Sequence, residues 1–344
     1  MNYLINEFDF EYDEYLKNHF ADIVNNDKNA MEKNIEVLDR KYKSSKKFFI
    51  DYKKFKFAFL RNLLHENNTD FITKKYFSNS EILFNNNAYT NLFLQIYTNY
   101  FTFFSKTTDG YRLNYAIQSG NYYGINKIFY KKKHLVKNSN LRELIILKSL
   151  HDAFYDKRYN KSALIAILND FKKETENEKN LEIANNILKK TTILMENYKA
   201  PDFELLDRDG YPITLSQFKG KFVYLNFATS WSYTCRQDFR LLQKLQKKYW
   251  QFLEVVTIVA DDNFEKMTEL IADEEFKWTL VDYKNQMDIL KTYNIRTYPT
   301  YYLIDTDGTL LMSPAPSPNK DFERHFVNIL IKKNANIDKI LDEK

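Results

Sequence analysis

Cysteine is almost absent from this sequence. A single one, Cys235, occurs among 344 residues, so the chain cannot close an internal disulfide or build a zinc site from cysteine ligands. The five histidines are scattered without the spacing of metal ligands, and no glycine-rich phosphate loop occurs. The sequence therefore predicts no metal site and no bound cofactor.

Glycine and proline are also scarce, with 6 of each against 28 Phe and 26 Tyr. Because Gly and Pro mark tight turns, a chain with so few of them is expected to consist largely of well-packed helices. No apolar run approaches the roughly 20 residues that a membrane-spanning helix needs. We therefore predict no transmembrane segment.

The first twenty residues are acidic, whereas a secretion signal needs basic residues followed by an apolar run. They contain Glu7, Asp9, Glu11, Asp13 and Glu14. The printed sequence is therefore expected to carry no export signal, and a cytoplasmic location stays open.

Basic residues do not form a stripe along the sequence. The formal net charge is only +5, and Lys and Arg are dispersed among carboxylates and Asn. Nucleic-acid binding needs a clustered basic surface with interleaved aromatics. We therefore expect no nucleic-acid partner.

The spacing of apolar residues along the sequence changes at Lys199–Pro201. Before this point apolar residues recur at helical spacing, and after it short β-rich runs alternate with helical ones. We expect an α+β chain of two domains, with an all-α domain over 1–198 and an α/β domain over 199–344.

Within the first domain, Phe48, Tyr52, Phe55 and Phe59 lie on one face of a single helical segment. Further helices are expected at about 69–77, 88–104, 139–157, 160–175 and 178–196. A short strand or extended arm is expected near 3–12, where apolar and acidic residues alternate.

The second domain follows the order of a βαβ unit and its continuation. Buried strands are expected at Phe222–Phe227 and Phe252–Ala260, with a helix at Arg236–Tyr249 between them. A later strand is expected at Tyr301–Ile304 and a final helix at Asp321–Lys332. Asp261 and Asp262 follow the second strand, and we expect them to be a solvated pair in a loop.

Three segments of this domain resemble a known family. Their order is Ala200–Phe203 with Leu215–Lys221, then Tyr224–Arg236, then Tyr298–Gly308. They are similar to the entry, the Cys-x-x-Cys motif and the cis-proline loop of TlpA/ResA-type thioredoxin-like domains, in the AhpC/TSA-redoxin clan. The resemblance implies a thioredoxin fold, with a central mixed sheet flanked by helices.

The helical first domain resembles the amino-terminal extension that precedes such domains in many Bacteroidetes proteins. Members of this family are exported. The resemblance therefore implies a periplasmic or cell-envelope location, in contrast to the acidic first residues.

The redox motif departs from the family pattern at its first position. Ser232 stands where the family has its first cysteine, and Cys235 holds the second position. The first position lies at a helix N-terminus, where free amides and the macrodipole stabilise a thiolate. A serine oxygen is too basic to ionise there and does not exchange with disulfides. Dithiol chemistry is therefore expected to be lost, which leaves Cys235 as the possible reactive residue.

The resemblance also implies a peptide groove beside the motif. Pro299 matches the cis-proline of the family, which turns the backbone of Tyr298 toward the motif and lets it pair with an extended polypeptide or protein partner. The expected groove residues are Trp231, Tyr233, Thr234, Tyr298, Pro299 and Thr300.

Three functions remain open at this point. The favoured one is a redox-degenerate binding module, in which the fold and groove persist without electron transfer. The second is a one-cysteine peroxiredoxin-like peroxidase, in which the Ser232 hydroxyl would hold peroxide at the Cys235 thiolate. The third is a monothiol exchange protein that uses Cys235.

Overall fold

The computed structural model of the chain describes residues 2–19, 25, 27–64, 69–132, 135, 137–273 and 276–333. It divides into two units, Met1–Leu188 and Lys189–Lys344. This division falls inside a helix and before residue 198. The domain boundary expected at 198/199 stays a prediction.

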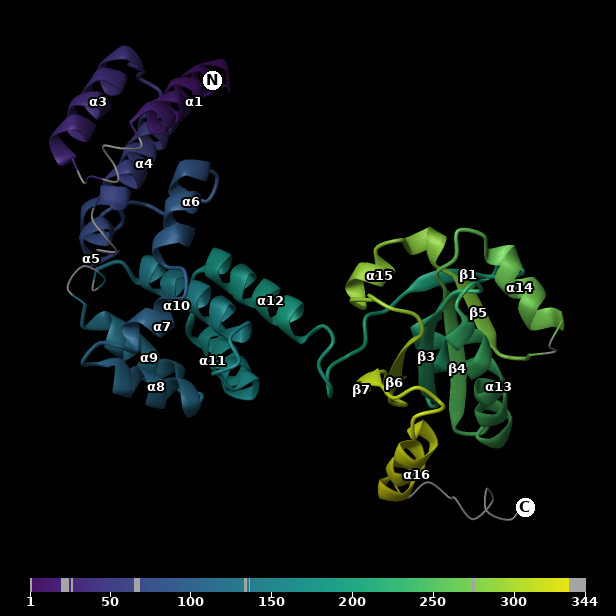
Figure 1. Cartoon of the computed structure of the whole chain (residues 1–344). Coiled ribbons are helices and arrows are strands. Elements are labelled where there is room, and N and C mark those ends of the chain that lie inside the picture. The colour runs from purple at the N-terminus through teal and green to yellow at the C-terminus, as the bar shows by residue number, and fades with distance from the viewer. Residues whose placement is uncertain are drawn as a thin grey trace. The chain divides into compact units, whose positions relative to one another are not determined.

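In its described residues the first unit is built from helices (Figure 1). They are α1 (Asn2–Asn18), α3 (Lys28–Lys41), α4 (Lys47–Leu64), α5 (Thr69–Ile72), the π-helical turn η1 (Thr73–Phe77), α6 (Asn87–Ile96), α7 (Tyr100–Phe104), α8 (Gly110–Gln118), α9 (Tyr122–Tyr130), α10 (Ser139–Phe154), α11 (Lys161–Glu174) and α12 (Glu178–Thr192).

The strand or arm expected near 3–12 is wrong, because this segment lies inside helix α1. Phe8 and Tyr12 are buried one helical turn apart, whereas Phe10 is 67% exposed. In a strand all three side chains would share one face. The ring of Phe8 packs edge-on against Phe49 of α4, with centroids 5.8 Å apart. Packing on α4 therefore selects the helix over the local alternation of apolar and acidic residues.

The expected helix over 88–104 is broken into α6 and α7. Asn99 lies between them with a φ of 53°, a left-handed conformation that a continuing helix cannot contain. Asn tolerates this conformation better than most residues, since its short side chain can hydrogen-bond locally. The helices α8 and α9 lie in a stretch for which no separate helix was predicted.

Aromatic rings form much of the core of the first unit. The rings of Phe55, Phe77 and Tyr89 meet pairwise with centroids 4.7 to 5.3 Å apart, and the rings of Phe93 and Tyr97 meet at 4.9 Å. Tilted and edge-to-face pairs of this kind add to the free energy gained by burial. All three tryptophans of the sequence fall in the second unit.

The second unit is a mixed sheet of seven strands in the order β2-β1-β5-β4-β3-β6-β7. The strands are β1 (Glu204–Asp207), β2 (Pro212–Thr214), β3 (Phe222–Ala228), β4 (Leu253–Val259), β5 (Thr279–Asp282), β6 (Thr300–Ile304) and β7 (Leu310–Ala315). The helices are η2 (Leu215–Phe218), α13 (Tyr233–Lys248), α14 (Phe264–Asp273), η3 (Tyr283–Gln286), α15 (Ile289–Thr292) and α16 (Phe322–Lys332).

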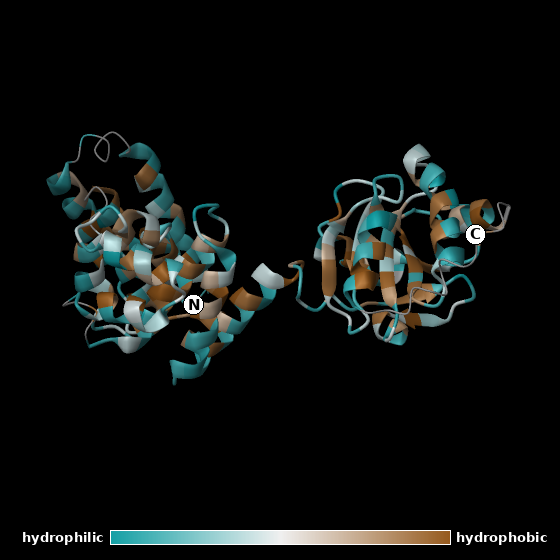
Figure 2. Cartoon of the chain, turned by 90° about the horizontal axis from the view of Figure 1, so that it is seen from below, coloured by the Kyte–Doolittle hydropathy of each residue, from teal (hydrophilic) through white to brown (hydrophobic). Residues whose placement is uncertain are grey.

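Both faces of this sheet are covered. Tyr224 and Ala228 of β3 belong to the core that α13, α14 and α16 close, while Leu225 and Phe227 belong to the core on the side of α15. Figure 2 shows the strands as largely hydrophobic. A helical region followed by an α/β unit with a central mixed sheet flanked by helices was expected, and this fold class is confirmed.

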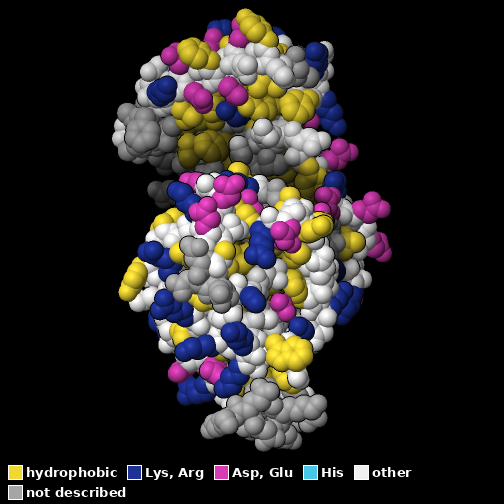
Figure 3. All heavy atoms as spheres, turned by 90° about the vertical axis from the view of Figure 1, so that its right-hand side faces the viewer, with side chains coloured by type: hydrophobic (Ala, Val, Ile, Leu, Met, Phe, Trp, Pro, Cys, Tyr) yellow, Lys and Arg dark blue, Asp and Glu magenta, His cyan; other side chains and the backbone are white. Residues whose placement is uncertain are grey.

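Among the described residues, no helix is both long enough and apolar enough to cross a bilayer. On the face shown in Figure 3, basic, acidic and hydrophobic side chains are interspersed. The absence of a nucleic-acid partner stays a prediction.

The α1 packing can be tested with two substitutions of the same type. Phe8→Ala should lower the free energy of unfolding by about 3 to 5 kcal/mol, because it leaves a cavity against α4, whereas Phe10→Ala should change it by less than about 0.5 kcal/mol. Urea denaturation of the full chain followed by far-UV circular dichroism measures both. Equal losses in the two variants would contradict the burial pattern of a helix.

Candidate functional site

The motif lies at the end of the sheet where strands β3 and β4 finish and strand β6 begins. Strands β3 and β4 run parallel with Ala228 opposite Val259, and β6 starts antiparallel to β3 with Thr300 opposite Phe227. The segment after β3 and the segment before β6 therefore lie at the same end of the sheet. This topology brings the Ser232 motif and the Pro299 loop together.

Ser232 is the N-cap residue of α13. Its side-chain oxygen accepts a hydrogen bond from the backbone N–H of Cys235 at 3.4 Å, and the residue is buried. An N-cap serine satisfies one of the free amides at a helix start. The serine therefore preserves the helix start that the motif requires while it lacks the sulfur of the family's first cysteine.

Cys235 is fully buried, with 0% of its surface exposed. It packs in the core with Phe239 and Leu242 of the same helix. Burial raises the pKa of the thiol, and the negative charges of Asp238 and Asp261 add to this, while hydrogen bonds from Ser232 and Thr229 oppose it. Burial therefore favours the neutral thiol over the thiolate.

Trp231 and Tyr298 form an aromatic edge beside the motif. The Trp231 side chain is 70% exposed, and its ring meets that of half-buried Tyr298 at right angles, with centroids 6.1 Å apart. The bond between Tyr298 and Pro299 is cis. The structure thus brings together three of the residues that the sequence assigned to a groove.

Of the other three groove candidates, two are exposed and one stabilises a loop. Tyr233 is exposed, and its hydroxyl accepts a hydrogen bond from Gln237 of its own helix at 2.8 Å. Thr234 is also exposed. The Thr300 hydroxyl donates to the carbonyl oxygen of Thr297 at 2.6 Å and so stabilises the loop before β6.

Asp261 belongs to the site although the sequence placed it in a solvated loop. It is only 3% exposed, and its Oδ2 accepts a hydrogen bond from the backbone N–H of Ser230 at 2.7 Å. Its Oδ1 and the hydroxyl of Thr229 have no partner among the described residues. The sequence feature that could have indicated this position is that Asp261 follows a buried parallel strand, because α/β folds often have functional groups there.

Asp238 lies one turn beyond Cys235 on α13 and is fully buried. Its carboxylate accepts hydrogen bonds from the hydroxyl of Tyr301 at 2.9 Å and from the amide of Asn319 at 3.0 Å. Burial raises its pKa. The bond from Tyr301 joins α13 to β6, and the bond from Asn319 joins α13 to the segment before α16.

No cluster of His, Cys, Asp and Glu in the described part of the chain could hold a metal ion. The site consists instead of a buried thiol, a capping serine, two buried carboxylates and two aromatic rings. Its sulfur is buried, whereas the Trp231 ring is exposed beside the motif.

The shielding of Cys235 can be measured. We expect its reaction with a small disulfide reagent to be slow at neutral pH and to accelerate only above the ordinary thiol pKa of about 8.5. Ser232→Ala should raise the pKa of Cys235 further, because the serine hydrogen bond lowers it, and should cost about 1 kcal/mol of stability through loss of the cap. The same reaction in denaturant is the control, and fast reaction of the folded chain near pH 6 would contradict the assignment.

Comparison with known proteins gives a consistent result. Residues 197–312 match the AhpC/TSA family model. The thioredoxin-like protein YneN of Bacillus subtilis is 35% identical over 124 residues, which are 36% of this chain and 72% of that protein. The thiol-disulfide oxidoreductase ResA of Geobacillus kaustophilus is 30% identical over 152 residues, 43% of this chain and 85% of that protein.

Two further matches are to a second ResA and to a solved structure. This chain spans 65% of the length of ResA from Bacillus thuringiensis, at 32% identity. A solved structure of a putative thiol:disulfide interchange protein DsbE from Chlorobium tepidum is 31% identical and is covered to 97%, against 40% of this chain, with a TM-score of 0.36. The family match and the relatives YneN and ResA show that the chain belongs to the TlpA/ResA-type thioredoxin-like family, within AhpC/TSA.

Proposed function

We propose that the thioredoxin-type unit is a redox-degenerate module that binds an extended polypeptide and is not a working dithiol enzyme. The observation that carries this proposal is the state of the two motif positions. The oxygen of Ser232 caps α13 where the family has its attacking sulfur, and Cys235, the one cysteine of the chain, is fully buried.

The aromatic edge supports the binding role. A ligand strand beside the Pro299 loop would pair with backbone groups of Tyr298 and pack against the exposed face of Trp231. Pairing of a few residues leaves a modest net gain after ordering costs, so an affinity in the micromolar to millimolar range is expected, by an order-of-magnitude estimate.

The same observation weighs against the peroxidase and the monothiol exchange protein. Both need a thiolate that a small molecule or a disulfide can reach. The thiol of Cys235 is unexposed and its pKa is raised by burial.

The compartment that we propose, on the family resemblance, is the periplasm or cell envelope.

A dithiol assay tests the redox part. The purified chain should reduce insulin disulfides no faster than a free-thiol background, because a dithiol cycle needs two cysteines. Ser232→Cys should form a disulfide between positions 232 and 235 after mild oxidation, and should gain activity over the unmodified chain. Activity of the unmodified chain above background would refute the redox-degenerate assignment.

A binding assay tests the groove. Carboxymethylated insulin B chain, which cannot exchange disulfides, is a suitable labelled probe, and Trp231→Ala should weaken its binding about tenfold, equivalent to about 1.4 kcal/mol. Trp250→Ala is the matched control, since Trp250 is also well exposed but lies just beyond the far end of α13. The change in fluorescence anisotropy of the probe on titration measures both. Equal effects of the two substitutions would move the binding surface away from the motif.

A further inference from the structure

Asp261 is a buried carboxylate at the site to which neither the sequence nor the proposed function assigns a role. It follows the last residue of β4, Val259, by two positions and is 3% exposed. The N–H of Ala260 donates to the carbonyl oxygen of Ala228 at 2.9 Å, so the pairing of β4 with β3 continues as far as Ala260. The backbone that carries Asp261 is therefore held by the centre of the sheet.

The carboxylate of Asp261 reaches the loop that joins β3 to α13. Its Oδ2 accepts the hydrogen bond from the backbone N–H of Ser230 at 2.7 Å, which is within the usual range for a bond of this type. A second bond of the loop, from the N–H of Ser232 to the carbonyl oxygen of Thr229, is long at 3.4 Å. The bond to Asp261 is therefore the firmer of these two constraints on the loop.

Trp231 directly follows the donor of this bond. Its side chain is 70% exposed, and its ring meets that of Tyr298 with centroids 6.1 Å apart. A buried core side chain is fixed by contact with about six to twelve residues, whereas a ring as exposed as this one has fewer neighbours to hold it. The place of the ring beside Tyr298 therefore depends on the course of the loop backbone.

The carboxylate also lies near the other ring of the aromatic edge. Burial raises the pKa of the Tyr298 hydroxyl, and interactions with Tyr283 and Asp261 raise it further. Asp261 is thus bonded to the residue before Trp231 and is electrostatically close to Tyr298.

Stability alone explains this carboxylate poorly. Its Oδ1 and the hydroxyl of Thr229 are buried and have no partner among the residues that the structure describes. Buried polar atoms without a partner are costly for stability. The arrangement points to a role at the groove.

We infer that Asp261 is a positioning residue that, through the N–H of Ser230, holds the Trp231 ring against Tyr298 and so keeps one wall of the groove in place. Its effect on a ligand passes through Trp231, because the side chain of Asp261 is too deeply buried to form a surface itself. The part that concerns binding rests on the function proposed above, whereas the position of the Trp231 ring can be measured without a ligand.

The position of the ring can be read from the indole N–H signals of the full chain, labelled with nitrogen-15 tryptophan, by NMR. Trp231→Ala identifies the signal of Trp231 by its loss. Asp261→Ala should shift this signal toward that of an indole free in water, because the ring leaves Tyr298, while the signals of Trp250 and Trp278 stay in place. Asp261→Asn retains an oxygen that can accept from Ser230 and should keep the native signal.

Asp305→Ala is the matched control. Asp305 is also a buried carboxylate, 8% exposed, and its Oδ1 accepts the backbone N–H of Thr306 at 2.7 Å. It follows β6, which begins at the motif and ends at the far end of the sheet. Its loss should therefore disturb the fold without moving the Trp231 signal.

Folding of each variant is checked by far-UV circular dichroism. If Asp261→Ala does not fold, Asp261→Ser takes its place, since the shorter side chain leaves its oxygen short of the N–H of Ser230.

A double-mutant cycle tests the link to binding, with labelled carboxymethylated insulin B chain as the probe. Asp261→Ala should weaken binding about as much as Trp231→Ala does, roughly tenfold. The double variant should bind no more weakly than Trp231→Ala alone, because both substitutions remove the same wall and are therefore not additive. Asp305→Ala should leave the affinity unchanged.

Two outcomes of the NMR experiment would overturn the inference: an unmoved Trp231 signal in Asp261→Ala, and an equal movement in Asp305→Ala. Additive weakening in the double variant would also contradict it, because Asp261 would then act on the ligand by another route. If the unmodified chain does not bind the probe while the Trp231 signal moves as expected, the proposed function fails and the positioning by Asp261 stands.

Discussion

Strand β3 is the constraint on which the second unit depends. It is paired on both edges, parallel to β4 and antiparallel to β6, and all of its residues are buried. Its one polar residue, Asn226, donates from Nδ2 to the hydroxyl of Thr257 at 3.3 Å. A slip of one residue would send every side chain to the opposite face. The same register brings the segment after β3 to the loop before β6, where the rings of Trp231 and Tyr298 meet.

Much of this fold could be predicted from local pattern. The strand at Phe222–Phe227 and the helix after it stand out because a continuous apolar run and an amphipathic period are local signals. The strands β5 and β7 were not predicted. β5 has only four residues, and β7 contains Pro314, which is typical of edge strands and weakens a strand signal. β5 pairs with β1, which is distant in sequence, and with β4, whereas β7 pairs with β6, the strand just before it.

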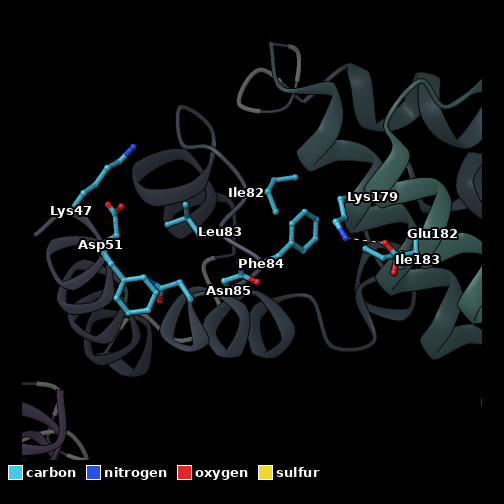
Figure 4. Close-up of a pocket in the computed structure, with 11 residues that line it drawn as sticks. Lys47, Asp51, Ile82, Leu83, Phe84, Asn85, Lys179, Glu182 and Ile183 are labelled. Carbon is cyan, nitrogen blue, oxygen red and sulfur yellow. Dashed lines mark hydrogen bonds and ion pairs between the residues drawn. The ribbon is translucent and has the colours of Figure 1, made fainter. Parts of the chain in front are cut away.

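The candidate site, like the fold, could be predicted from the sequence only where its residues are close together in the chain. Ser232 and Cys235 could be located because their spacing and the strand before them are contiguous in sequence. The burial of Asp261 could not, because it depends on the N–H of Ser230, thirty-one positions away. The helical unit also has a pocket, shown in Figure 4, that is lined by residues from the starts of α4, α6 and α12, and no local pattern indicates that these three helix starts meet.

The distribution of tryptophan separates the two units spectroscopically. Trp231, Trp250 and Trp278 all lie in the second unit, while the rings in the core of the first are those of Phe and Tyr. Tryptophan emission therefore reports on one unit alone, with Trp231 at the groove as an exposed fluorophore and Trp278 as a buried one. Melting or ligand binding confined to the first, helical unit would leave that emission unchanged. The intrinsic fluorescence of the native chain can therefore show which of the two units responds.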